Sequence, residues 1–324
     1  DQRALLSGEA FADLSDHDVL AVSGPDRLSW LDSLTSQRLT DLEPGRSAET
    51  LLLDPSGRVE YAARVVDDGA TTWLLMDAGT GAGLAEFLGR MRLLLRVEVA
   101  DRSAEFATLG SFGLVPESAV VVWTDPWSSV TAGGWQYAAD EPEAVTDWAW
   151  IEVLVPREAL VSSTLGPVGL VGEDAAEALR IAARRPRAAT ELDATTIPHE
   201  LDWLRSAVHL DKGCYRGQET VAKVHNLGHP PRRLTLLHLD GSDGGLPEHD
   251  DAVVLGDATV GRITAAARHF ELGPIALAVL KRTTDPSAPL VVRTADGPVA
   301  AAQEVIVPVD AGATANVPRL TRIR

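Results

Sequence analysis

The segment DKGCYRGQETVAKVHNLGHPP, Asp211–Pro231, divides this sequence into two parts with different patterns. It contains Cys214, which is the only cysteine of the chain, and two of its three lysines, Lys212 and Lys223. Its second half predicts a short helix, because Gly228 and the prolines beyond it are signals with which helices end. Strand and helix patterns alternate before the segment, whereas short strands separated by Gly, Pro and Asp turns follow it.

These patterns predict strand and helix signals of the α/β type first and a small all-β part at the C-terminus. In the first part, two turns at 54–57 and 67–69 connect three expected antiparallel strands. Ser23, with Asp26 three residues later, is expected to cap a helix that follows a strand around residues 19–22. We therefore predict two domains, 1–230 and 231–324.

Composition and charge exclude several classes of protein. The chain has 324 residues, of which 45% are hydrophobic and 23% are charged, as in ordinary globular proteins. A net charge of −18 repels nucleic acid. The sequence has no apolar run of about 18 residues or more, the length that spans a membrane, and it lacks the order of a secretory signal. We expect a cytoplasmic protein that binds neither nucleic acid nor membrane.

Cys214 lies in a loop just before the predicted helix. Gly213 and Gly217 allow backbone N–H groups to point toward a common anion or thiolate. Lys212, Arg216 and the helix dipole each favour thiolate over thiol, so the pattern predicts a reactive cysteine. The alternative is a small buried hydrophobe in a tight turn. Local chemistry alone favours neither interpretation.

The run KGCYRGQE, Lys212–Glu219, followed by Lys223, resembles the signature of the YgfZ-type folate-binding proteins, which are linked to iron–sulfur cluster assembly and repair. Further stretches are similar to that family and to its relative, the aminomethyltransferase (T-protein) of glycine cleavage: VSGPDRLSWLDSLTSQRL, LLLDPSGRV, ALRIAARRPR, IPHELDWL and VGRITAAA.

The resemblance implies a ring of three subdomains around a central channel. These are a ferredoxin-like α+β element, a second α+β element and a C-terminal β-barrel. It also implies tetrahydrofolate, or a one-carbon derivative, in the channel. Among the signature residues, we expect Tyr215, Arg216, Gln218 and Lys223 to contact the folate.

In two places the sequence departs from the T-protein pattern. The catalytic aspartate of that enzyme follows the turn that here spans 55–57, where Glu60 is the only acid available. The longer side chain moves the carboxylate by about an ångström or more, which spoils aimed proton transfer. The glutamate that holds the pterin is replaced by Ala182. The T-protein signature also lacks the Cys214 loop. All three differences count against aminomethyl transfer.

Without that glutamate, the pterin needs other contacts. Glu200 is a candidate acceptor and Trp203 a candidate stacking surface, although a helix N-terminal acid and a core aromatic are the commoner roles of such residues. A group of arginines lies at the end of a predicted helix, where the dipole favours cations: Arg180, Arg184, Arg185 and Arg187. We favour the dipole explanation for the group, and expect Arg180 to contact the carboxylate tail of folate as well.

The sequence therefore predicts a tetrahydrofolate-binding accessory protein of iron–sulfur cluster assembly or repair, with no resident metal. Cys214, supported by Lys212, would lie near the mouth of the central cavity and transiently ligate iron or exchange a mixed disulfide with a client protein. Its partners would be folate and iron–sulfur client proteins or assembly factors. Two alternatives are an aminomethyltransferase that uses Glu60, and a non-catalytic interaction module with an inert Cys214.

Overall fold

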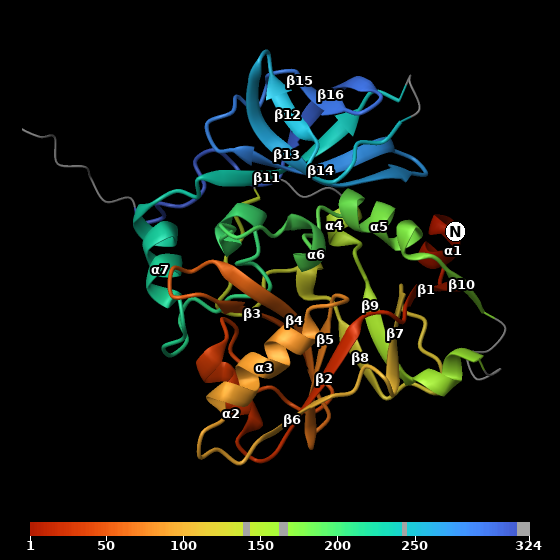
Figure 1. Cartoon of the computed structure of the whole chain (residues 1–324), viewed down its shortest axis with the longest axis vertical. Helices are drawn as coiled ribbons and strands as arrows, with labels where there is room; N and C mark the ends of the chain where they lie inside the picture. The colour runs from red at the N-terminus through yellow and green to blue at the C-terminus, as the bar shows by residue number, and fades with distance from the viewer. Residues whose placement is uncertain (139–142, 162–167, 242–244, 316–324) are drawn as a thin grey trace, which may run out of the picture.

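The computed structural model describes residues 1–138, 143–161, 168–241 and 245–315. Within them the chain forms two five-stranded sheets and a closed six-stranded barrel. Figure 1 shows the barrel at one end of the molecule, the two sheets at the other end, and short helices between them. The predicted α+β class with a C-terminal β-barrel is confirmed.

The first sheet has the strand order β3-β4-β5-β2-β6, and all its neighbouring strands are antiparallel. The two predicted turns connect β3, β4 and β5, as expected from the sequence. Helices α2 and α3 cover one face through an apolar cluster that includes Trp30, Leu31, Leu84 and Leu88. The strands are β2 (Asp18–Ser23), β3 (Ser47–Leu53), β4 (Val59–Asp67), β5 (Thr71–Met76) and β6 (Glu98–Asp101).

The second sheet has the order β10-β1-β7-β9-β8, in which only the β1–β10 pair is parallel. It is buried on both faces, because its side chains contribute to two separate apolar clusters. Its strands are β1 (Ala10–Leu14), β7 (Phe106–Ser111), β8 (Val121–Thr124), β9 (Ile151–Pro156) and β10 (Gly169–Val171).

The barrel begins directly after the predicted division of the chain. Its strand order is β11-β14-β13-β12-β15-β16, with every neighbouring pair antiparallel. One apolar cluster includes both Trp203 and Leu236, so it crosses the division at 230 and 231. The strands are β11 (Arg232–Leu239), β12 (Ala252–Leu255), β13 (Ala258–His269), β14 (Gly273–Lys281), β15 (Leu290–Thr294) and β16 (Gly297–Val305).

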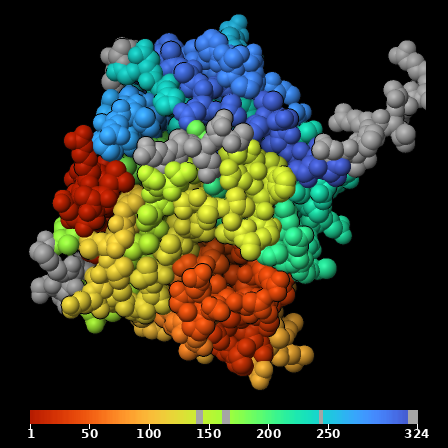
Figure 2. Space-filling view, turned by 180° about the vertical axis from the view of Figure 1, so that it is seen from behind, coloured from red at the N-terminus to blue at the C-terminus, as the bar shows by residue number. Residues whose placement is uncertain are grey.

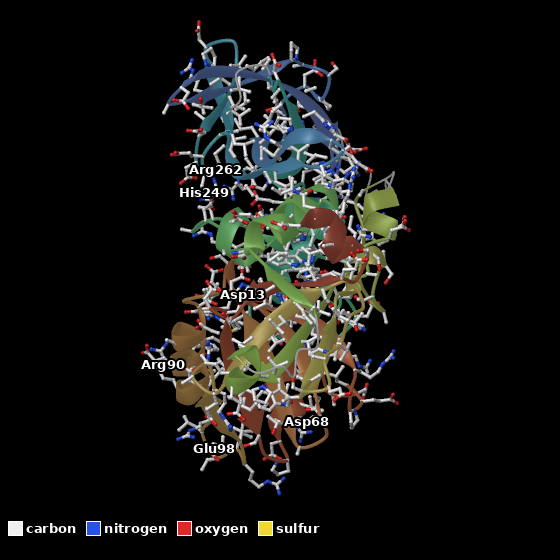
Figure 3. All side chains as sticks on the ribbon, turned by 90° about the vertical axis from the view of Figure 1, so that its right-hand side faces the viewer. Asp13, Asp68, Arg90, Glu98, His249 and Arg262 are labelled. Atoms are coloured by element: carbon white, nitrogen blue, oxygen red, sulfur yellow. The ribbon has the colours of Figure 1, made fainter. Side chains whose placement is uncertain are left out.

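A layer of short helices separates the barrel from the sheets (Figure 1). Helix α5 packs against β13 and β14, and α6 packs against β13. Arg262, labelled in Figure 3, reaches from β13 to the carbonyl of Glu191 at 3.3 Å. The α-helices are α1 (Gln2–Leu6), α2 (Arg27–Leu34), α3 (Gly81–Met91), α4 (Glu143–Thr146), α5 (Glu173–Ala182), α6 (Ala188–Glu191) and α7 (Gln218–Leu227). The 3-10 helices are η1 (Pro126–Ser128), η2 (Arg157–Val161) and η4 (Pro198–Leu201).

The expected N-cap of α2 was wrong. The helix begins at Arg27 with Asp26 as its N-cap residue. Ser23 is still part of β2, where it pairs with Thr71 and Glu98. Ser23 therefore belongs to the strand and does not serve as the N-cap of the helix.

The dipole explanation for the arginine group holds for only one of its members. Helix α5 ends at Ala182, with Arg180 in its last turn. The other three arginines lie beyond the helix and pair with acids of other elements. Arg184 contacts Glu304 of β16, and Arg187 contacts Glu173.

Arg185 connects the two sheets. Its guanidinium lies 2.6 Å from Glu49 of β3 and 2.9 Å from Asp125 of the loop after β8. All three residues are buried, and the two acids hold the pKa of Arg185 above its usual value in spite of its burial. Because a buried charge is costly without a partner, this contact requires both sheets to be in place.

Arg185→Met should strongly destabilise the protein, because it leaves Glu49 and Asp125 buried without their cation. We expect a loss of about 3–5 kcal/mol in the free energy of unfolding, measured by urea denaturation. Arg38→Met is the matched control, since Arg38 and Asp41 form an exposed pair whose loss should cost less than about 1 kcal/mol. Equal midpoints for the two variants would contradict the role of Arg185.

Candidate functional site

Lys212 anchors the cysteine loop to the end of helix α2. Its buried ammonium donates to the carbonyl oxygens of Asp32, Thr35 and Gln37, with Nζ to oxygen distances of 2.8 Å for the last two. The end of a helix leaves carbonyl groups without partners and carries partial negative charge, so a cation is favoured there. All three donors of the ammonium are thus used by backbone carbonyls, one in α2 and two just beyond its end. The structure indicates a positioning role for Lys212.

Gly217 in the cysteine loop and Gly57 in the β3–β4 turn let these two segments pack closely together. Gly217 is the N-cap residue of α7 and has φ +83°, a conformation that favours glycine, whereas the φ of Gly213 is not positive. A Cβ on Gly217 would lie 2.6 Å from the carbonyl oxygen of Asp54, and one on Gly57 would lie 2.8 Å from Thr220. This close approach places the cysteine loop beside β4.

The remaining signature residues lie in different environments. Cys214 is exposed, so its side chain is not part of a core. Tyr215 is buried, its ring lies 5.3 Å from Nζ of Lys212, and burial raises the pKa of its hydroxyl. Gln218 donates to the carbonyl of Lys212 at 3.3 Å, and Lys223 is exposed on α7. Their expected contacts with folate stay predictions.

Arg216 extends from this loop into a large cleft. Its guanidinium lies 2.8 Å from the carboxylate of Glu60 in β4 and 5.6 Å from the ring centroid of Phe87 in α3. The structure thus brings together the cysteine loop and the acid that the sequence placed after the turn 55–57. Cys214 is two residues from Arg216, so their Cα atoms are at most about 7.6 Å apart.

The cleft has a volume of about 1080 Å³ and lies between β4, α2, α3 and the segment after α6. Arg90, which Figure 3 shows projecting outward from α3, lies at its edge. The lining combines charged and apolar side chains: Asp54, Arg58, Glu60, Glu86, Arg90, Asp193 and Arg216 with Leu34, Val59, Tyr61, Phe87, Met91 and Leu192. Such a lining suits a ligand that has both an aromatic body and charged groups.

The structure does not bring Glu200, Trp203 and Arg180 into this cleft. Both oxygens of Glu200 accept hydrogen bonds from Arg232, at 2.9 and 2.7 Å, at the start of the barrel. Trp203 is buried in the core. Arg180 is buried between Glu177 and Glu191, whose charges raise its pKa although burial opposes this. All three have structural contacts here, and their assignment to folate binding stays a prediction.

The space where the two sheets meet α5 is nearly filled. Its cavity measures about 50 Å³ and is lined by ion-paired side chains, among them Arg64, Glu152 and Arg180. Pockets for ligands of drug size measure about 300–1,000 Å³. This cavity is smaller than such pockets, so the outer cleft is the candidate site in this structure, and folate in a central channel stays a prediction.

Sequence reasoning missed several side chains of the cleft. Phe87 and Asp193 lie in none of the quoted motifs, and Arg58 lies in LLLDPSGRV without a predicted role; they approach Glu60 only because β4, α3 and the segment after α6 meet. The one local signal was the turn 54–57, since a turn that ends a strand is a common place for functional residues. Among the described residues, no group of three or more His, Cys, Asp or Glu side chains is placed to hold a metal.

A buried histidine, His199, forms a hydrogen bond with helix α7. His199 is fully buried, and its Nε2 donates to the carbonyl of Val221 at 3.0 Å. Its Nδ1 has no hydrogen-bond partner within the described parts of the chain. Burial, together with the nearby His225, lowers the pKa of His199 to about 4. The ring is therefore neutral at pH 7.

Lys212→Met should loosen the cysteine loop, because it leaves three carbonyl oxygens at the end of α2 without their donor. We expect the free energy of unfolding to fall by about 2–3 kcal/mol and hydrogen exchange in the loop to accelerate. Lys223→Met is the matched control, since this exposed lysine should be replaceable without loss. The anchoring role would be wrong if both variants behaved alike.

The fold should lose stability below pH 6.5, because unfolded His199 takes up a proton that the folded state rejects until about pH 4. The loss from this group should reach about 2 kcal/mol at pH 5 relative to pH 7.5. Urea unfolding at both pH values measures it. His199→Gln keeps a donor for Val221 and should flatten the pH dependence; an unchanged slope would contradict the assignment.

Comparisons with known proteins relate this chain to aminomethyltransferases. No model of a protein family matches the sequence. A chloroplastic protein of Arabidopsis thaliana that carries the name of a transferase is 25% identical over 293 residues, which cover 84% of this chain and 66% of that protein. About a third of that protein thus lies outside the match. An aminomethyltransferase of Rippkaea orientalis is 26% identical over 317 residues, covering 87% of this chain and 81% of its own.

The fold is similar to a solved structure. The crystal structure of the glycine cleavage system aminomethyltransferase T from Bartonella henselae matches with a TM-score of 0.70 over 94% of this chain and 89% of that chain. The two sequences are 16% identical, so this likeness concerns the fold alone. This chain therefore has the fold of the glycine cleavage T-protein and a sequence related to aminomethyltransferases.

Proposed function

We propose that this protein binds a tetrahydrofolate in the outer cleft and acts as an accessory protein of iron–sulfur cluster assembly or repair through Cys214. The observation that carries the proposal is the contact between Arg216 and Glu60. Through this contact, Arg216 of the cysteine loop forms part of the wall of the cleft. A ligand in the cleft and a partner at Cys214 would thus act on the same segment.

The chemistry of the cleft fits a folate. Folate combines a flat pterin, which has hydrogen-bond donors on one edge, with a tail that ends in carboxylates. Asp54 and Glu60 offer acceptors for the donors, and Phe87 offers an aromatic surface. Arg58 and Arg90 offer guanidinium groups for the tail. Bound tetrahydrofolate would supply a carrier of one-carbon units.

The position of Glu60 argues against aminomethyl transfer as the main activity. Its carboxylate is already paired with Arg216 at 2.8 Å, so a transfer reaction that used Glu60 would first have to displace this partner. An arginine from the cysteine loop thus holds the acid that would have to replace the catalytic aspartate. This supports a role for the loop itself.

An exposed apolar loop beside the cleft supports a protein partner. Leu93, Leu94 and Leu95 follow α3, and the first two are almost fully exposed. Leu94 has φ +63°, a conformation that costs about 1–2 kcal/mol for a residue other than glycine. This strained loop, which projects from the lower edge of the surface in Figure 2, lies next to Met91 of the cleft. Apolar side chains gathered at an exposed tip are typical of contact surfaces.

A second candidate function is aminomethyl transfer, favoured by the relatives that carry this name. In that case Glu60 would have to exchange its partner Arg216 for substrate. The third alternative, a non-catalytic interaction module, requires no chemistry of Cys214 at all.

Calorimetric titration with tetrahydrofolate tests the proposed cofactor. We expect the wild-type protein to bind, and Arg58→Glu to weaken binding about tenfold or more, because it reverses a charge that faces the folate tail. Arg46→Glu is the control, since this exposed arginine lies outside the cleft. Cys214→Ala should bind folate like the wild type, and it should fail to restore iron–sulfur enzyme activity in cells that lack the protein.

Three results would change this conclusion. Failure of the wild type to bind tetrahydrofolate would contradict the cofactor. Full restoration of activity by Cys214→Ala would remove the role of the thiol and favour an interaction module. Folate-dependent release of ammonia in a glycine-cleavage assay with the purified protein would establish aminomethyl transfer instead.

A further inference from the structure

A second hollow, distinct from the outer cleft, opens between helix α5 and the turn that connects β13 to β14. Its volume is about 250 Å³, somewhat below the about 300–1,000 Å³ of pockets for drug-sized ligands, so it suits a smaller organic molecule. Three aromatic rings line it, and they come from three distant parts of the chain: Phe112, Trp148 and Phe270.

The rings of this pocket are held in place by their neighbours. Phe112 meets Trp148 edge to face, with the ring centroids 5.2 Å apart. Trp148 is stacked on Trp150 at 5.7 Å, and its Nε1 donates to Asp125 at 2.9 Å. Asp125 is the residue that also binds Arg185. The buried network of the core therefore fixes one wall of the pocket.

The charged side chains of this pocket are negative, as expected for a site that binds a cation. Asp147 and Glu271 are exposed and line it, and neither lysine nor arginine is among its lining residues in the described parts of the chain. An anion such as folate would be repelled by both carboxylates, whereas a cation would be attracted. The outer cleft, by contrast, contains arginines as well as carboxylates.

One of these rings, that of Phe270, already contacts a cationic side chain of the protein itself. Phe270 also lines a neighbouring cleft, in which the guanidinium carbon of Arg3 lies 5.1 Å from its ring centroid. This is within the distance of about 6 Å at which cations and aromatic faces attract each other. The protein thus uses the ring as a surface for positive charge.

A buried histidine offers the pocket a hydrogen-bond donor. His269 is 7% exposed, and its Nδ1 accepts the backbone N–H groups of Glu271 and Leu272 at 3.2 and 3.1 Å. Neutral imidazole has one proton, which must then be on Nε2. No other described residue forms a hydrogen bond with Nε2, although His269 lines the pocket. A ligand with an acceptor would supply the missing partner.

We infer that this aromatic pocket binds a small organic cation, of the quaternary-ammonium or alkylated-amine class, that also carries a hydrogen-bond acceptor. The rings of Phe112, Trp148 and Phe270 surround the cationic head, and Asp147 and Glu271 neutralise its charge. Nε2 of His269 donates to the acceptor. The site is independent of the proposed folate cleft, with which it shares no lining residue.

Calorimetric titration of the full chain with choline tests this inference against two matched probes. 3,3-Dimethylbutan-1-ol has the shape of choline without its charge, and should bind about tenfold more weakly or not at all. Tetramethylammonium has the charge without the acceptor hydroxyl, and should bind less tightly than choline. Asp147→Asn and Glu271→Gln should each weaken choline binding about three- to tenfold. Phe270→Leu should weaken it by at least as much.

Glu117→Gln removes one exposed carboxylate elsewhere on the surface and should bind choline like the wild type. Because Asp147 and Glu271 are exposed, their amide variants should fold normally, as circular dichroism and thermal unfolding will check. Three outcomes would overturn the inference: no binding of choline by the wild type, equal binding of the neutral alcohol, or undiminished binding by all three pocket variants. None of them bears on folate binding, which is measured separately at the outer cleft.

Discussion

The buried guanidinium of Arg185 is the contact on which the arrangement of the sheets depends. It joins Glu49 of one sheet to Asp125, which follows a strand of the other. Glu49 also accepts a hydrogen bond from Ser206, and Asp125 accepts one from Trp148. A buried charge is destabilising unless each of its partners is present, so such a network favours one arrangement of the chain over slightly shifted ones.

This network also decides where ligands can bind. Because ion pairs fill the space between the sheets, the larger hollows lie on the outside of the molecule, and they differ in charge. The cleft beside the cysteine loop combines arginines, Arg58, Arg90 and Arg216, with carboxylates, whereas the aromatic pocket at α5 is lined by the carboxylates Asp147 and Glu271 without an arginine or lysine among the described residues. This difference in charge favours different classes of ligand at the two sites, although the chain as a whole carries −18.

In the cysteine loop, the sequence motif predicted which residues lie together, but it did not predict what their charged groups contact. The sequence marked Lys212, Arg216 and Gly217 as a group around one thiol, and the structure keeps them together. Their charged groups, however, have partners other than the thiol, since Lys212 binds carbonyl oxygens at the end of α2 and Arg216 binds Glu60. A compact ammonium with three donors suits three converging carbonyl groups, which explains the use of lysine in an arginine-rich chain.

The sequence by itself determined the local structure: the antiparallel strands joined by turns 54–57 and 67–69, helix α7 with its glycine ends, and the change to an all-β part after Pro231. Periodicity and turn chemistry act over a few residues, so they can be read directly. Only the tertiary structure decided the site. Lys212 and Asp32 are 180 residues apart in sequence, and Arg216 and Glu60 are 156 apart. Such contacts depend on how the elements pack against one another, which no local pattern encodes.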